Sequence, residues 1–279
     1  MYAKLDNLEV GDDYPVRIMG ILNVSPESFY KGSVRSTSGE LKRAAELMAA
    51  AGADIIDIGA RSTAPYLKTD ISTDEEINRI CQAIEAARGI CDLPISADTF
   101  IGPVAKAAQT AGATILNDVS GLAHDSELAE AAHAFKGLIL MANGLYTNAR
   151  GSAFEVVSQA LKECLERAKT AKLDQASIVL DPGIGFFRSY AQNDWSAWDR
   201  TILQNLNKWQ SLRHPLAVSV SRKSFIGHIL DHPDPNDRLY GSLAVTMFSL
   251  LQGAHIIRTH DVAAVRDLCK MTSWLKQKD

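Results

Sequence analysis

The sequence predicts an α/β protein of the (β/α)8 barrel (TIM barrel) class, with residues 1–279 forming a single domain. Short apolar segments rich in Val, Ile and Leu occur eight times, and a segment with helical periodicity separates each from the next. A chain of 279 residues also has the usual length of one such barrel. A doubly wound open sheet is the alternative, but no G-x-G-x-x-G phosphate loop opens any of the helical segments.

The eight apolar segments are predicted as parallel strands, because near-continuous apolar character is typical of strands that are covered on both faces. In chain order they are residues 16–24, 54–60, 94–100, 114–120, 137–143, 177–183, 216–221 and 254–261. Several of them begin about 40 residues apart, which leaves room for a loop, a crossover helix and a return to the sheet.

The segments between the strands are predicted as helices. They are residues 41–53, 74–88, 103–112, 126–134, 152–172, 195–212, 238–252 and 262–276. The second has Thr73 before it and Glu76 three residues later, which predicts a capping box. The third begins with Pro103 and ends with Gly112, the asymmetry expected of helix ends.

Composition excludes several classes of protein. Hydrophobic residues make up 46% and charged residues 22%, as in ordinary globular proteins. The 29 basic and 33 acidic residues give a net charge of −4, so no nucleic-acid partner is expected. No apolar run is long enough to span a membrane.

Cysteine usage and the N-terminal residues indicate a cytoplasmic protein. The four cysteines, Cys81, Cys91, Cys164 and Cys269, form no C-x-x-C pair and match no zinc-site spacing. Reduced thiols in a reducing compartment are therefore expected. The first 14 residues include early acidic residues and no apolar stretch of the kind found in secretory signals.

Polar residues gather where the predicted strands end, which is where active sites form in such barrels. The hydrogen-bond acceptors there include Asp98, Asn117 and Asp181, which suit a flat heterocycle with several N–H groups. Four cationic or titratable residues follow the last two strands: Arg222, Lys223, Arg258 and His260. Phosphate commonly binds at that place in such barrels. The expected substrate therefore has a polar ring at one end and phosphate at the other.

Some acidic residues near the strand ends have a simpler interpretation. Asp118, Asp125 and Asp261 each precede a predicted helix or loop, where an aspartate often caps a helix N-terminus. We expect these three to be structural.

Five segments resemble the signature segments of the dihydropteroate synthase family, in the same order and across nearly the whole chain. They are GILNVSPESF (20–29), NDVSG (117–121), LDPGIGF (180–186), SRKSFIG (221–227) and IIRTHDV (256–262). The resemblance implies a pterin-binding TIM barrel and a transferase of folate biosynthesis. In that reaction the amine of p-aminobenzoate displaces pyrophosphate from 6-hydroxymethyl-7,8-dihydropterin diphosphate, with Mg²⁺ on the diphosphate. It also implies a homodimer.

The resemblance further implies roles for individual residues. The implied catalytic residues are Asp98, Asp181 and Lys223. The implied pterin-binding residues are Asp98, Asn117, Met141, Asp181, Phe186 and Lys223. Asn23, Thr63, Arg258 and His260 would bind the diphosphate, with Asn23 also near the metal. Phe29, Pro65, Phe186 and Ser221 would form the arylamine pocket.

The chain departs from the family pattern mainly in the first two loops. Five positions carry a different residue: Lys31 for an aspartate, Arg61 for a glutamate, Ala64 for an arginine, Ala142 for a histidine and Arg188 for a lysine. Lys31, Arg35 or Arg61 could restore the lost positive charge, or could be ordinary surface charges. The pterin end thus matches the family better than the end that receives the arylamine.

Three other functions are compatible with the same barrel. A pterin-dependent methyltransferase would share Asp98, Asn117 and Asp181 but would not need the SRKS cluster, since no diphosphate departs. A non-catalytic pterin-binding protein with diverged loops, and a synthase that uses another arylamine, are the remaining alternatives.

Trp195, Trp198 and Trp209 give the helix after the sixth strand a large apolar surface, which suits either the core or a dimer interface.

Overall fold

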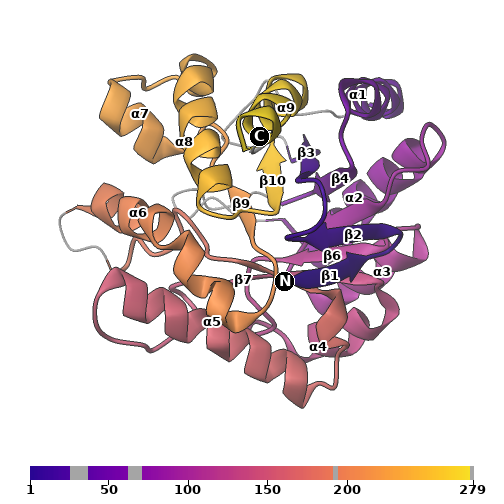
Figure 1. Ribbon diagram of the computed structural model, residues 1–279. Coiled ribbons are helices and arrows are strands. Elements are labelled where there is room, and N and C mark those ends of the chain that lie inside the picture. Colours follow the sequence, from indigo (N-terminus) through magenta and orange to yellow (C-terminus); the bar gives the residue numbers. More distant parts are fainter. Residues whose placement is uncertain (26–36, 62–70, 191–193, 277–279) are drawn as a thin grey trace.

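A computed structural model describes residues 1–25, 37–61, 71–190 and 194–276, and its eight parallel strands form a nearly closed barrel inside a ring of helices (Figure 1). The strands are β3 (Arg17–Asn23), β4 (Ile55–Gly59), β5 (Ile95–Asp98), β6 (Ile115–Asp118), β7 (Gly137–Met141), β8 (Ile178–Asp181), β9 (Ala217–Ser219) and β10 (Ile256–Thr259). Each lies inside the segment predicted for it. The predicted fold class is therefore confirmed.

Neighbouring strands in the sequence are neighbours in the barrel, and β10 returns to pair with β3. The remaining gap, between β8 and β9, is bridged by the pairing of Leu180 with Leu216. The amide of Leu180 donates to the carbonyl of Pro215 at 2.9 Å. Because all eight strands run the same way, their carboxyl ends meet at one mouth of the barrel.

Helices cover the outside of the barrel in the order of the sequence (Figure 1). The α-helices are α1 (Ser38–Ala51), α2 (Thr73–Arg88), α3 (Gly102–Thr110), α4 (Ser126–Ala131), α5 (Ala153–Thr170), α6 (Trp195–Gln204), α7 (Ser224–Leu230), α8 (Leu239–Leu251) and α9 (Val262–Lys276). Short 3-10 turns are η2 (Ala132–Ala134), η3 (Gln175–Ser177), η4 (Leu206–Leu212) and η5 (Pro235–Arg238). Within these described residues, no helix is both long and apolar enough to cross a bilayer.

Two helix predictions were wrong in detail. The capping box of α2 does not involve Thr73, because Ser72 is the N-cap and its side chain accepts from the amide of Glu75. Glu76 is buried instead and has another partner, described below. The helix predicted over 195–212 is interrupted at Asn205, after which the chain continues as the 3-10 turn η4.

The sequence reading also missed α7 and an N-terminal hairpin. Strands β1 (Tyr2–Leu5) and β2 (Leu8–Gly11) pair antiparallel around a two-residue turn with Asp6 at φ 57°. In Figure 1 the hairpin lies across the middle of the ring of helices. Ala3, Leu5 and Val10 pack against the first residues of the barrel strands, such as Ile55 and Ile115. The hairpin therefore closes the mouth opposite to the carboxyl ends.

We expect Leu5→Ala to destabilise the protein by about 2–4 kcal/mol, because Leu5 is fully buried and the change leaves a cavity in the closed mouth. Urea denaturation measures the loss. Lys4→Ala, on the exposed face of the same strand, is the control and should stay within about 0.5 kcal/mol of the parent. Equal stability of both variants would contradict a packed hairpin.

Candidate active site

The strand register brings the predicted polar residues to the same mouth of the barrel. Asn23 at the end of β3 pairs with Gly59 at the end of β4, and Gly59 pairs with Asp98 at the end of β5. Asp98 in turn pairs with Asn117 on β6. A Cβ atom added at Gly59 would lie 3.3 Å from Oδ2 of Asp98 and 3.7 Å from Oδ1 of Asn23. The glycine therefore allows these two side chains to approach each other.

Arg258 on β10 connects two buried carboxylates across the mouth. Its Nε donates to Oδ2 of Asp57 at 2.6 Å, and its Nη2 donates to Oδ2 of Asp98 at 2.6 Å. The amide nitrogen of Asn117 lies 3.3 Å from Oδ2 of Asp57. Asp57 thus links Arg258 to Asn117, and the four side chains form one network.

The second oxygen of Asp98 lacks a hydrogen-bond partner within the described part of the chain. Oδ1 is buried, and such an orphaned acceptor is rare in a native structure. Burial raises the pKa of Asp98 to about 7, although the charge of Arg258 acts in the opposite direction. An N–H group of a bound ligand would complete the hydrogen bonding of this carboxyl.

Asp181 and Lys223 form the opposite side of the mouth. Asp181 pairs with Met141 in the β7–β8 register, and its Oδ1 accepts from the amide of Gly183 at 2.8 Å. Lys223 donates to the carbonyl of Ile184, and its Nζ lies 4.9 Å from the centre of the Phe186 ring. Burial lowers the pKa of Lys223 to about 8 and raises that of Asp181, while their mutual attraction opposes both shifts.

Arg258 also acts electrostatically on Asp181 and Lys223. The structure therefore brings together Asp98, Asn117, Asp181, Lys223 and Arg258, as the sequence predicted. Their roles in binding or catalysis stay predictions.

His260 also lies at this mouth. Its Nδ1 is 2.9 Å from Oγ of Ser221. Burial, together with the charges of Arg258 and Arg222, lowers the pKa of His260 to about 3. A ring nitrogen of His260 can serve a phosphate as a hydrogen-bonding group.

Arg222, expected among the phosphate-binding residues, makes contacts between two loops. Its guanidinium forms a bidentate pair with Asp261, at 2.9 and 2.7 Å, and also donates to the carbonyls of Pro235 and Asn236. These contacts tie the loop after β9 to the loop after β10. That Arg222 belongs to the phosphate-binding group stays a prediction.

The three aspartates expected to be structural are structural, in different ways. Asp125 is the N-cap of α4 and accepts from the amide of Glu127. Asp118 accepts from the amides of Ser120 and Leu122 and so fixes the loop after β6. Asp261 pairs with Arg222 as described.

Arg61 is not an ordinary surface residue, because its guanidinium contacts a buried carboxylate. Its Nε donates to Oε2 of Glu76 at 2.6 Å, and its Nη2 donates to the carbonyl of Ile71 at 2.8 Å. Glu76 is buried, and its Oε1 also accepts from the hydroxyl of Thr99, the residue after Asp98. Arg61 therefore neutralises a carboxylate beneath the strand ends.

Several predicted residues lie outside the described part of the chain. They are Phe29, Lys31, Arg35, Thr63, Ala64 and Pro65.

Two other residues that depart from the family pattern are described. Ala142, at the position of the family histidine, is buried, and its amide donates to the carbonyl of Asp181. The guanidinium of Arg188 lies 4.0 Å from the centre of the Trp195 ring.

Sequence reasoning assigned none of three buried acids to the site: Asp57 and Asp199 received no role, and Glu76 was expected in a capping box. The signal that could have found them is a charge at a core-facing position. Asp57 interrupts the apolar segment of β4, and Glu76 lies one turn before Ile80 on the buried face of α2. Asp199 lies on the apolar face of α6, one turn before Ile202.

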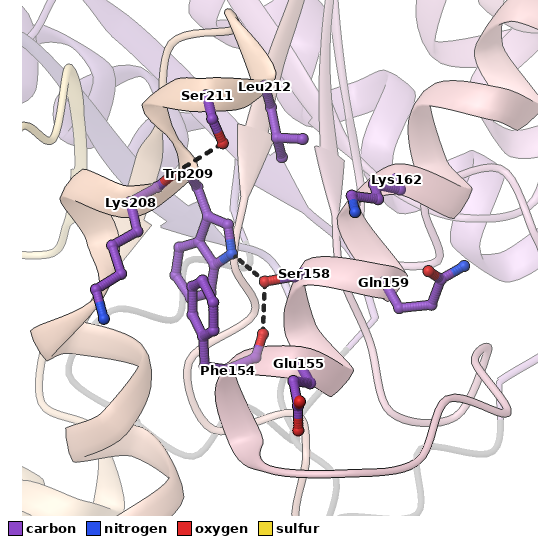
Figure 2. A pocket seen from close by; sticks show the side chains of 9 residues that line it. All are labelled: Phe154, Glu155, Ser158, Gln159, Lys162, Lys208, Trp209, Ser211 and Leu212. Carbon is purple, nitrogen blue, oxygen red and sulfur yellow. Dashed lines mark hydrogen bonds between the residues drawn. The ribbon is translucent and has the colours of Figure 1, made fainter.

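A groove of about 360 Å³ lies between α5 and η4, outside the barrel (Figure 2). Phe154 and Trp209 stack along it with ring centres 5.6 Å apart. The indole N–H of Trp209 donates to Ser158 at 2.8 Å. None of the predicted site residues within the described ranges lines this groove.

The chain is similar to known proteins over most of its length. Residues 19–260 match the family described as pterin binding enzymes. The dihydropteroate synthase of Synechocystis sp. is 36% identical over 266 residues, which cover 92% of this chain and 89% of that protein. This chain belongs to the dihydropteroate synthase family.

Solved structures of the family resemble the chain over its whole length. Dihydropteroate synthase from Xanthomonas albilineans with 4-aminobenzoic acid has a TM-score of 0.88 and 30% identity, with all of both chains covered. The enzyme from Coxiella burnetii in complex with pteroic acid has a TM-score of 0.84 and 32% identity, again with full coverage of both chains. The pterin-binding barrel expected from the sequence is thus confirmed.

We expect Arg61→Met to lower the free energy of unfolding by about 3–5 kcal/mol, because it leaves the buried carboxylate of Glu76 without its cation. Thermal or urea denaturation measures this. The double variant Arg61→Met/Glu76→Gln removes both charges and should recover most of the loss. A double variant no more stable than the single one would contradict the pairing of these two charges.

Proposed function

We propose that this chain catalyses the dihydropteroate synthase reaction, joining 6-hydroxymethyl-7,8-dihydropterin diphosphate to p-aminobenzoate or a related arylamine and releasing pyrophosphate. One observation carries the proposal: Asp98, Asn117, Asp181 and Lys223 meet at one barrel mouth in a chain of this family. The step belongs to folate biosynthesis.

The pterin end of the substrate fits the polar groups of the mouth. The orphaned Oδ1 of Asp98 can accept from a ring N–H, and Asp181 and Asn117 offer further polar atoms. Lys223 can donate to the ring carbonyl. Met141 and Phe186 would lie against the faces of the ring. Uncompensated buried acceptors disfavour a ligand without N–H groups, which gives the site its specificity.

The reaction breaks the bond between the methylene carbon of the pterin and the diphosphate oxygen, and pyrophosphate leaves with the electron pair. The arylamine nitrogen then forms a bond to that carbon and loses a proton. Positive charge develops on the pterin as the bond breaks. The preorganised carboxylates of Asp98 and Asp181 would stabilise this charge.

Asn23, Arg258 and His260 would receive the diphosphate, with Thr63 from the second loop. Among the described residues no group of three or more His, Cys, Asp or Glu side chains could hold a metal ion. An amide oxygen such as Oδ1 of Asn23 suits Mg²⁺, which usually takes few protein ligands when it binds a phosphate substrate. Bound Mg²⁺ would neutralise charge on the departing pyrophosphate.

The arylamine would lie beside Ser221 and Phe186, with Phe29 and Pro65 from the first two loops. A relative in the same family has a solved structure with 4-aminobenzoic acid, which supports p-aminobenzoate as the acceptor here. The altered residues of both loops make this the part of the site where specificity for a related arylamine would arise.

We expect pyrophosphate release from the pterin diphosphate and Mg²⁺ to depend on added p-aminobenzoate. Lys223→Ala should reduce turnover at least about a hundredfold, as is typical for loss of a preorganised polar group. Lys208→Ala, in the groove of Figure 2, is the control and should leave turnover unchanged. Release without any need for an arylamine would contradict the synthase reaction.

We also propose that the protein is a cytoplasmic homodimer. The four cysteines are free thiols, which suits a reducing compartment. Trp209 is buried, and Trp195 and Trp198 are half-buried and pack against the core, so an interface at these tryptophans stays a prediction.

Helix α8 offers a better surface for a second copy, because its amphipathic pattern is inverted. The buried side chains of its inner face include Ser242, Thr246 and Ser249. Its exposed side chains include Tyr240, Phe248 and Leu251. The neighbouring α9 exposes Met271, Trp274 and Leu275. An apolar outer face of this extent is typical of a protein interface.

We expect Phe248→Asp/Leu251→Asp to convert a dimer into a monomer, because both charges would be buried in the interface. Light scattering coupled to size-exclusion chromatography measures the mass. Ile90→Asp, at an exposed apolar residue after α2, is the control and should leave the dimer intact. A parent protein that is monomeric at micromolar concentration would refute the proposal.

A further inference from the structure

Asp199 is a buried carboxylate in a helix that is otherwise packed by apolar side chains. It is 3% exposed and lies on the face of α6 that also carries Trp195 and Ile202. A charge in such a place is costly unless it is hydrogen-bonded and paired. Its partners therefore indicate why an aspartate is present.

The first partner is the backbone turn that follows β8. The amide of Gly185 donates to Oδ1 of Asp199 at 2.6 Å. Gly185 has φ 86°, and a Cβ atom there would lie 3.6 Å from both Cδ and Nζ of Lys223. Asp199 thus holds in place the turn against which the lysine side chain lies.

The second partner is the charge of Lys223 itself. Four charged groups act on its ammonium: Asp181 on β8, Asp199 on α6, Arg258 on β10 and Arg188 in the turn after β8. Both arginines favour loss of the proton, as does burial, whereas the two carboxylates oppose it. Asp199 is thus one of two carboxylates that favour the charged form of the lysine.

We infer that Asp199 is a positioning residue for Lys223, holding the Gly185 turn by a hydrogen bond and keeping the lysine charged from helix α6. The inference rests on the proposed function only for the identity of the ligand that Lys223 contacts. Nothing in the signature segments pointed to Asp199, because it lies outside all of them.

The charge of Lys223 can be followed directly in the protein without substrate. Lysine labelled with ¹³C at Cε gives side-chain NMR signals that titrate with pH, and the Lys223→Arg variant identifies the signal of Lys223. Asp199→Asn keeps an oxygen that can accept from Gly185 but removes the charge. The pKa of Lys223 should fall by about 1 unit in this variant.

Two further variants separate positioning from general stability. Asp194→Ala removes the N-cap of the same helix, where the side chain of Asp194 accepts from the amide of Ala197, and should leave the titration of Lys223 unchanged. Asp199→Glu restores the charge and should return the pKa toward the parent value. A Lys223 titration that is identical in the parent and in Asp199→Asn would overturn the inference.

Kinetics then test the consequence for binding. At pH 8, Asp199→Asn should raise the KM for the pterin diphosphate about fivefold, because a smaller fraction of Lys223 is protonated. The KM for the arylamine should not change. A parent protein without transferase activity would reject the proposed function while the NMR titration still decides the role of Asp199. Equal changes in both KM values would contradict an effect through Lys223.

Discussion

The ion pairs of Arg258 with Asp57 and Asp98 are the interaction on which the rest of the site depends. They join strands β4, β5 and β10, which are far apart in the sequence, at one end of the barrel. Two buried carboxylates near each other would otherwise favour protonation or separation. Arg258 keeps them together and leaves one oxygen of Asp98 available to a ligand.

Burial and charge act against each other throughout this mouth. Burial raises the pKa of Asp98 to about 7 and lowers that of Lys223 to about 8, while opposite charges nearby limit both shifts. Burial thus moves both pKa values toward neutrality from those of the free side chains. The pair of Arg61 and Glu76 lies behind Thr99, so the charge balance extends from the mouth to helix α2.

The two mouths of the barrel carry different kinds of side chain, because all strands are parallel and each mouth collects one end of every strand. The hairpin of β1 and β2 closes one mouth with apolar side chains and contributes to stability. The other mouth gathers the polar residues at the strand ends. On the outside, the inverted pattern of α8 leaves an apolar face exposed while its buried hydroxyl groups bond within the chain, as Ser242 does with Arg222 and Arg238.

The sequence by itself determined the fold class, the eight strands, the family and the residues that end the strands, because periodicity and signature segments are local properties of the chain. Only the tertiary structure showed that Arg258 pairs with two carboxylates, that burial lowers the pKa of His260 and that Arg222 pairs with Asp261. Partners and pKa shifts depend on burial and on residues distant in the sequence. The proposed role of Asp199 could not be predicted from the sequence for the same reason. It depends on Gly185 and Lys223, which only the folded barrel brings to helix α6.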